Sequence, residues 1–316
     1  MISLEKLFKA GVHFGHQKRR WSPKMAPYIW GYKNNIHLID ISKTALQLEK
    51  ASKFLKGLAS EGKTVLWVGT KRPAQNVIEQ AAKRLDMPYV NHRWIGGTLS
   101  NFAQVKKSVT KYLHYNDVLA KADKYPHYTK KELNTIQKAA ARLEQNVGGI
   151  LHLSWPVGAL VVVDAIKERS ALREAATMGV PVVALVDTNA DPSMVDIVVP
   201  TNDDSPRAIQ VLVEYMADAV EAGRQEHKQK VQEEKEQKEL ERLAAKKEKE
   251  AKAPKKEKAE AAEPKKAAEK KPAVKKENKA KEAAAPKKEA AKKPAAKKPA
   301  AKKTEAKSPA KKSAKK

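Results

Sequence analysis

Three continuous apolar runs alternate with stretches of helical periodicity along the first two thirds of the chain. The runs TVLWVG (64–69), ALVVVDA (159–165) and VPVVALVDT (180–188) are typical of strands buried on both faces of a sheet. Helical patterns separate them, as over 73–85, which opens on a proline, and over 167–178. Strands that alternate with helices imply right-handed βαβ units and a parallel sheet covered on both faces. The pattern predicts an α/β fold, a doubly wound (flavodoxin-like) parallel sheet flanked by helices.

Shorter apolar patterns place further elements around this sheet. Ser42 and Ser205 each precede a helical pattern and are expected to be N-caps, the second followed by Pro206 at the first helical position. The remaining elements expected from the pattern are helices over 3–10 and 42–60 and strands over 36–41, 87–90, 149–154 and 196–200.

Between about Gln104 and Val147 the apolar spacing becomes that of a helical hairpin. Val105, Val109, Tyr112, Asn116 and Leu119 follow a 4-3-4-3 spacing. A similar spacing relates Leu133, Ile136, Ala140, Leu143 and Val147, and TyrProHisTyr at 125–128 separates the two series. Two helices of about 20 residues would form an antiparallel coiled-coil arm about 30 Å long.

The segment Gly11–Thr44 combines cations with aromatic residues, glycines and prolines. Its cations Lys18, Arg19, Arg20, Lys24 and Lys33 all precede Asp40, the first acidic residue after Glu5. Interleaved with them are Phe14, Trp21, Tyr28, Trp30 and Tyr32, while glycine or proline at every fourth residue or so favours turns and extended backbone. Cations neutralise phosphates and aromatic rings stack on unpaired bases, so the segment is a candidate RNA contact. The alternative is an N-terminal arm whose aromatic rings pack on the core.

The net charge of +27 is unevenly spread. Residues 1–145 hold 26 basic and 10 acidic residues (+16), residues 146–223 hold 4 and 11 (−7), and residues 224–316 hold 34 and 16 (+18). This asymmetry favours a polyanionic partner for one part of the molecule. The absence of cysteine excludes disulfides, thiolate metal sites and cysteine nucleophiles. No apolar run is long enough to span a membrane, and we expect a cytoplasmic protein.

The chain changes character after Gly223, because residues 224–316 contain neither glycine nor an aromatic residue. Pairs such as Glu234 and Lys238 support a solvated charged helix over 224–252. The Lys/Ala/Pro-rich tract 253–316 cannot bury enough apolar surface to fold, and we expect it to be disordered. Such a tail resembles those of linker histones and binds polyanions through charge, unless its role is only to confer solubility.

Residues near the predicted strand ends are candidates for chemistry. The turn Gly69–Arg72 lies between a strand and a helix but is too short for the usual pyrophosphate-binding loops. Its Lys71 and Arg72 would suit an RNA phosphate equally well. Four aspartates lie at or just after predicted strand ends, and two histidines lie in the basic arm; they are Asp164, Asp187, Asp203, Asp204, His13 and His16. These residues could bind a metal ion, or the aspartates could cap helices and loops. We predict no catalytic site and no cofactor.

Taken together, several segments resemble the bacterial small-subunit ribosomal protein S2 family over about residues 1–222. They are GVHFGHQKRRWSPKMAPYIWG, NIHLIDISKT, VLWVGTKRPAQ, MPYVNHRWIGGTLSNF, GVPVVALVDTNADP and VPTNDDSPRAI. The resemblance implies an α/β domain with a projecting coiled-coil hairpin, seated on small-subunit rRNA between head and body. It also implies a structural, non-catalytic role, with neighbouring small-subunit ribosomal proteins and the mRNA-binding ribosomal protein S1 as partners, and no homo-oligomer.

Carried over by position, the resemblance gives a set of candidate RNA-binding residues in three segments. They are Lys18, Arg19, Arg20, Trp21, Lys24 and Lys33 in the basic arm, Lys71 and Arg72 in the strand-end turn, and Asn91, His92, Arg93, Trp94, Gly96 and Gly97 in the glycine-rich loop. Two rival functions are a phospholigand-binding enzyme of the same architecture and a nucleic-acid-coating protein that binds through its tail. The expected domains are 1–223, with the hairpin inserted, then the helix 224–252 and the tail 253–316.

Overall fold

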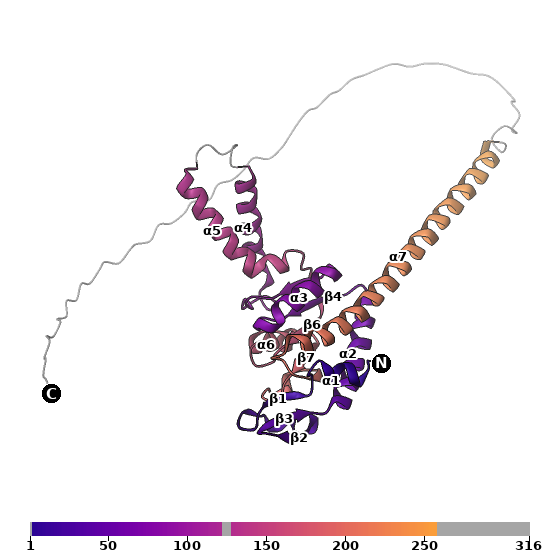
Figure 1. Cartoon of the computed structure of the whole chain (residues 1–316). Helices are drawn as coiled ribbons and strands as arrows, with labels where there is room; N and C mark the ends of the chain where they lie inside the picture. The colour runs from indigo at the N-terminus through magenta and orange to yellow at the C-terminus, as the bar shows by residue number, and fades with distance from the viewer. Residues whose placement is uncertain (1, 122–127, 258–316) are drawn as a thin grey trace, which may run out of the picture. The chain divides into compact units, whose positions relative to one another are not determined.

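The computed structural model describes residues 2–121 and 128–257, and its compact unit spans Met1–Pro254. The centre of this unit is a five-stranded parallel sheet in the order β5-β4-β6-β7-β8 (Figure 1). Its strands are β4 (Thr64–Val68), β5 (Tyr89–Val90), β6 (Val157–Val163), β7 (Val182–Val186) and β8 (Ile197–Pro200). In chain order this arrangement is 2-1-3-4-5, the flavodoxin-like order. The predicted doubly wound α/β fold is confirmed.

Helices cover both faces of this sheet. One core contains residues of α1 (Leu4–Lys9), α2 (Ile41–Ser60), α3 (Arg72–Leu85) and α7 (Pro206–Glu257), and the other contains residues of α6 (Arg169–Met178). Strand β6 serves both cores in alternation, with Ala159, Val161 and Val163 in the first and Leu160 and Val162 in the second. This period of two explains why the strand is apolar at nearly every position.

A helical hairpin is inserted between β5 and β6, as the change of period predicts. Its helices α4 (Phe102–Ala120) and α5 (Lys130–Val147) lie side by side (Figure 1), and Thr129 and Glu132 form a capping box at the start of α5. Val105, Val109 and Tyr112 are buried as expected. Asn116 is exposed, however, and Val118 is buried, so the predicted seam is wrong toward the end of α4. Most of the predicted break at 125–128 lies outside the described residues.

The basic arm folds as a second, antiparallel sheet in the order β1-β3-β2. Its strands are β1 (Phe14–Gln17), β2 (Ile29–Lys33) and β3 (Ile36–Ile39), with the 3₁₀ helices η1 (Lys18–Arg20) and η2 (Pro23–Tyr28) between β1 and β2. Asn34 and Asn35 join β2 to β3 with φ of 50° and 60°, as a type I′ turn requires. The sequence predicts β3 alone, because the glycines and prolines obscure the alternation of β1 and β2.

Two local predictions are wrong. Residues 149–154 form the end of the 3₁₀ helix η4 (Gly148–Ile150) and a turn instead of a strand, because Ile150 and Leu153 point into a core and Gly149 packs on the Tyr89 carbonyl. The N-cap of α2 is Asp40 and not Ser42: the Asp40 carboxylate accepts a hydrogen bond from the Ser42 amide over 3.0 Å. The 3₁₀ helix η5 (Pro192–Met194) precedes β8.

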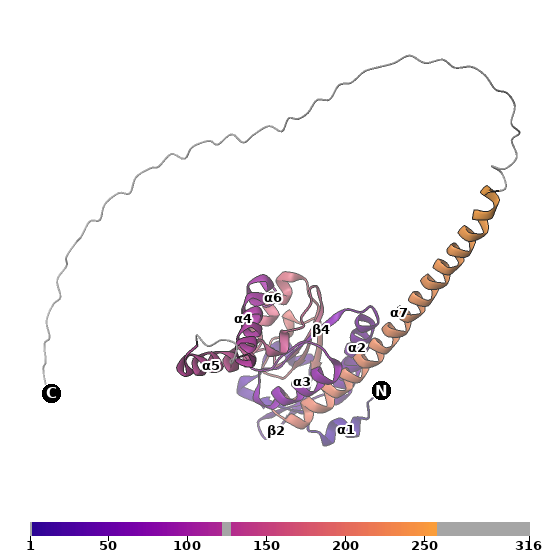
Figure 2. The same cartoon turned by 90° about the horizontal axis from the view of Figure 1, so that it is seen from above.

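Helix α7 runs without interruption across Gly223, where the sequence predicts a domain boundary. It passes beside α2 in both views (Figures 1 and 2), and a side chain at Gly223 would collide with the Lys56 carbonyl at 2.4 Å. Ser205 begins the helix as expected, its Oγ accepting from the Ala208 amide at 3.5 Å. The predicted helix ends at residue 252, but α7 continues to Glu257, so residues 253–257 are helical and not part of a disordered tail. The rest of the predicted tail lies outside the described residues. Among the helices of 2–121 and 128–257, none combines the length and apolar character that a bilayer crossing requires.

Candidate nucleic-acid interface

The basic arm is attached to the loop that follows β7. His16 donates its amide to Thr188 Oγ1 over 2.9 Å, and the Ser22 amide donates to the Thr188 carbonyl over 2.8 Å. Gly15 makes this approach possible, since a Cβ there would lie 2.6 Å from Thr188 Cγ2. On the other side, the amide of Asn202 donates to the Val12 carbonyl over 3.1 Å. The arm is therefore held at the carboxyl edge of the parallel sheet, where the loops after β7 and β8 lie.

His16, in strand β1 of the arm, faces a cluster of carboxylates at the edge of the parallel sheet. Its Nδ1 lies 2.8 Å from Asp187 Oδ2 and its Nε2 lies 3.4 Å from Asp204 Oδ2. The hydrogen bond to Asp187 raises the pKa of His16 above its ordinary value, although burial opposes this. Ligand atoms of His16, Asp203 and Asp204 lie within 4.8 Å of one another, and Asp203 Oδ2 is buried without a hydrogen-bond partner among the described residues. Nitrogen and carboxylate donors at this spacing could hold a divalent cation. His13 lies elsewhere, stacked on Phe8 with ring centroids 4.4 Å apart.

Lys71 extends from the end of β4 into the same cluster. Its ammonium lies 2.7 Å from Asp203, 2.7 Å from Asp204 and 3.7 Å from Asp164, and only 18% of its side chain is exposed. Burial alone would lower the pKa of Lys71, but the hydrogen bonds to Asp203 and Asp204 outweigh it and raise the pKa. The charge of Lys71 is thus matched within the protein, whereas its neighbour Arg72 is exposed.

The turn between β4 and α3, a candidate phosphate site from its sequence, is filled by the protein's own side chains. The amide and hydroxyl of Thr70 both donate to Glu168 Oε1, and Lys167 donates to the Thr70 carbonyl over 2.8 Å. Glu168 is buried, and burial raises its pKa. The Thr70 amide, which a nucleotide phosphate would need as a hydrogen-bond donor, is therefore already bonded to the Glu168 carboxylate.

The glycine-rich loop is likewise organised around an internal carboxylate, that of Glu174 in α6. Glu174 accepts hydrogen bonds from Trp94 Nε1 at 3.0 Å, from the Gly97 amide at 2.9 Å and from the Leu99 amide at 3.0 Å. Ser100 adds its amide and hydroxyl, each at 3.3 Å. Trp94 is only 8% exposed, so its ring packs in the core and is not available for stacking on a base.

Of the remaining candidates in the glycine-rich loop, one is hydrogen-bonded to a carboxylate of the protein and the others are exposed. Asn91 donates its side-chain amide to Glu79 Oε2 over 2.8 Å. His92, Arg93 and Gly96 are exposed. The loop therefore presents His92 and Arg93 outward on a scaffold that Glu174 holds together.

In the basic arm, all six candidate residues are exposed. They are Lys18, Arg19, Arg20, Trp21, Lys24 and Lys33. Lys24 is paired with Asp191 over 2.8 Å. The ammonium of Lys18 lies 4.3 Å from the ring centroid of Tyr32.

The most exposed aromatic rings of the arm belong to Trp30 (76%) and Tyr32 (63%). The sequence-based set omits both residues. The signal in the sequence is their i, i+2 spacing, which in a strand places both side chains on the same face.

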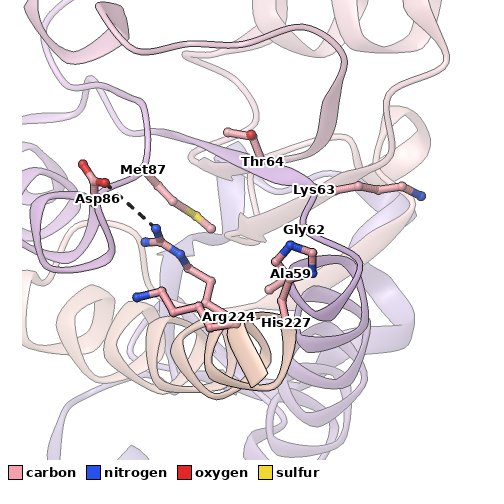
Figure 3. A pocket seen from close by; sticks show the side chains of 9 residues that line it. Ala59, Gly62, Lys63, Thr64, Asp86, Met87, Arg224 and His227 are labelled. Carbon is pink, nitrogen blue, oxygen red and sulfur yellow. Dashed lines mark ion pairs between the residues drawn. The ribbon is translucent and has the colours of Figure 1, made fainter. Parts of the chain in front are cut away.

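A separate pocket of about 200 Å³ lies between α7 and the carboxyl ends of α2 and α3, and neither the arm nor the glycine-rich loop lines it (Figure 3). His227 stacks on Gly62 in this pocket, its Nδ1 donating to the Ser60 carbonyl over 3.2 Å. Arg224 points toward Asp86, 4.0 Å away. Arg224 faces the carboxyl end of α3, where a positive charge offsets the helix dipole, and His227 satisfies a carbonyl at the end of α2. Helix termination therefore accounts for both residues.

These features define a doubly wound α/β protein with an inserted helical hairpin and an exposed, cation-rich arm. The family model of ribosomal protein S2 matches residues 7–223. The chain belongs to the ribosomal protein S2 family. It is therefore a structural protein of the small ribosomal subunit, associated with the ribosome, in a family that is in general structural and not enzymatic.

Proposed function

We propose that the basic arm binds small-subunit rRNA between the head and the body of the subunit. The observation that carries this proposal is the state of four cations: Lys18, Arg19, Arg20 and Lys33 are exposed, and none forms an ion pair with any residue that the structure describes. Lys24 of the arm and Lys71 at the end of β4 differ from these four, because each has a carboxylate partner. Cations left unmatched on one surface favour a polyanionic partner, because each bound phosphate releases counterions.

The remaining members of the proposed contact set follow from exposure. Arg72, His92 and Arg93 are exposed and stay in the set, as do Trp21 and Lys24 of the arm. Lys71, Asn91, Trp94, Gly96 and Gly97 shape the surface instead of contacting RNA in this proposal, since Lys71, Asn91, Trp94 and Gly97 bond to internal carboxylates.

We further propose that ribosomal protein S1 docks on the aromatic surface where α1 meets the start of the arm. Phe8, His13 and Phe14 stack in succession, with centroid distances of 4.4 and 4.0 Å. Phe8 and Phe14 remain 57% and 47% exposed. Exposed aromatic rings in contact with one another are characteristic of protein interfaces.

The test is sedimentation of tagged protein in a sucrose gradient of cell lysate. The full chain and a chain that ends at residue 223 are both expected to co-migrate with small subunits, because the contact set lies before Gly223. If only the full chain sedimented with nucleic acid, the tail would be the binding element and the coating function would replace ours. If neither did, the proposal would fail and the phospholigand-binding alternative would return.

A further inference from the structure

Four polar side chains without partners surround one pocket on the arm. The pocket has a volume of about 570 Å³ and is lined by Gln17, Lys18, Arg19 and Asn35. None of the four side chains forms a hydrogen bond or ion pair within the described part of the chain, apart from the contact of Lys18 with the Tyr32 ring. The volume falls within the range of about 300–1,000 Å³ that is common for small-ligand pockets.

The backbone around this pocket is fixed. Gln17 ends β1 and is paired with Ile36, and the Lys18 amide donates to the Asn35 carbonyl over 2.9 Å. Asn35 itself stands in the left-handed conformation of the β2–β3 turn. The two walls, Gln17–Arg19 on one side and Asn35 on the other, are therefore held together by the backbone itself.

The chemistry of the lining suits one kind of ligand. Lys18 and Arg19 supply positive charge for a phosphate, and no carboxylate lines the pocket. Gln17 and Asn35 supply carboxamides, which pair with the hydrogen-bonding edge of a base through a donor and an acceptor side by side. A base offers that edge only when it is unpaired, because duplex RNA hides it in a deep, narrow groove.

We propose that this pocket binds a single unpaired nucleotide of an RNA, with its phosphate on Lys18 and Arg19 and its base edge on Gln17 and Asn35. The inference rests on the proposed RNA-binding function and adds that the arm reads RNA structure, not charge alone. Neither Gln17 nor Asn35 is a cation or an aromatic residue, so a purely electrostatic surface would not need them.

The turn provides a matched control for the test. Asn34 and Asn35 are adjacent, have the same side chain and both adopt positive φ, but only Asn35 lines the pocket. Glycine tolerates this conformation, so Asn34→Gly and Asn35→Gly both preserve the turn. The full-length protein is titrated with two fluorescein-labelled RNA duplexes of the same sequence, one fully paired and one with a single-nucleotide bulge. A third titration uses free 5′-AMP.

The wild-type protein is expected to bind the bulged duplex about five- to tenfold more tightly than the paired one, the preference that one good base contact gives. Asn35→Gly and Gln17→Ala should each remove most of this preference, and Asn34→Gly should retain it. Equal binding of both duplexes by the wild type, or an equal fall in preference in both glycine variants, overturns the inference and leaves the proposed function intact. Failure of the wild type to bind either duplex overturns both. Binding of 5′-AMP as tight as that of the bulged duplex, abolished in Asn35→Gly, would show a free-nucleotide site and overturn the assignment to RNA.

Discussion

Trp94 donates its indole N–H to the carboxylate of Glu174 over 3.0 Å, from a loop to a helix 80 residues further along the chain. The same carboxylate accepts the amides of Gly97, Leu99 and Ser100. The N–H donors of the glycine-rich loop, which could have bound an RNA phosphate, thus bind a carboxylate of the protein itself. The loop that the family resemblance suggests as an RNA contact is therefore a closed structural unit, and it presents His92 and Arg93 as exposed side chains to a partner.

Glu174→Gln is therefore expected to destabilise the protein by about 1–3 kcal/mol, since the uncharged amide has one acceptor oxygen for several donors. Burial would raise the pKa of Glu174, but the hydrogen bonds from Trp94 and the loop amides outweigh it and lower the pKa. A lowered folded pKa means that this stabilisation is present above the unfolded pKa and disappears as the pH falls through the folded value. Urea titrations between about pH 5 and about pH 3 should show a smaller decrease in stability for the variant than for the wild type. Parallel curves would exclude the role given to Glu174.

Lys71→Met should destabilise the domain by about 3 kcal/mol, because it leaves the carboxylates of Asp164, Asp203 and Asp204 without their counter-charge. Arg72→Met is the control: Arg72 is the next residue, exposed and without an ion pair within the described residues, and its replacement should change stability by less than about 0.5 kcal/mol. Chemical denaturation measures both. A stable Lys71→Met protein with weakened RNA binding would return Lys71 to the contact set.

Replacing both Arg19 and Arg20 with glutamine should weaken rRNA binding without unfolding the domain, because both side chains are exposed. The slope of log K against log salt should become shallower by about 1.4–1.8, because each phosphate that the protein no longer neutralises accounts for about 0.7–0.9 of the slope. The control removes the same charge from Arg173 and Arg207, exposed arginines of α6 and the start of α7. Equal slopes in the two double variants would remove the arm from the binding surface.

The sequence predicts the elements whose cause is local and misses those whose cause is distant. Strand β6 is apolar because both of its faces are buried, and that is visible in the run itself. Strand β1 exists because Gly15 lets it approach Thr188, more than 170 residues away, and nothing near Gly15 announces that partner. The candidate site follows the same division. Charge density predicts the arm, but the internal partners of Lys71 and Trp94 come from a loop and from helix α6, which only the fold brings near.

Gly15→Ala tests how the arm is attached. An added Cβ would lie 2.6 Å from Thr188 Cγ2 and 3.2 Å from the His37 carbonyl, so β1 must shift and its hydrogen bond to Thr188 must weaken. The expected decrease in stability is about 1–3 kcal/mol, with faster proteolysis of the arm. Gly31→Ala is the matched control, since a Cβ at Gly31 in β2 meets nothing within 4 Å. Equal proteolysis rates in the two variants would show that the arm does not depend on this contact.

The last prediction concerns where the folded body ends. The family match stops at residue 223, yet α7 continues, and the residues just beyond still contact the body. Glu226 pairs with Lys56 over 2.7 Å, and His227 donates to the Ser60 carbonyl over 3.2 Å. An exposed ion pair contributes about 0–1 kcal/mol and a hydrogen bond about 0.5–1.5 kcal/mol.

A chain that ends at residue 223 should therefore be about 0.5–2.5 kcal/mol less stable than one that ends at residue 232, the sum expected for these two contacts. A chain that ends at residue 242 should match the second of these, because residues 233–242 are exposed along the helix. Guanidinium denaturation of the three chains decides the matter. Equal stability of all three would place the end of the folded body at Gly223, as the sequence predicts. A gain in stability between the chains that end at residues 223 and 232, with no further gain at residue 242, would instead show that the first two turns of the extension belong to the α/β domain.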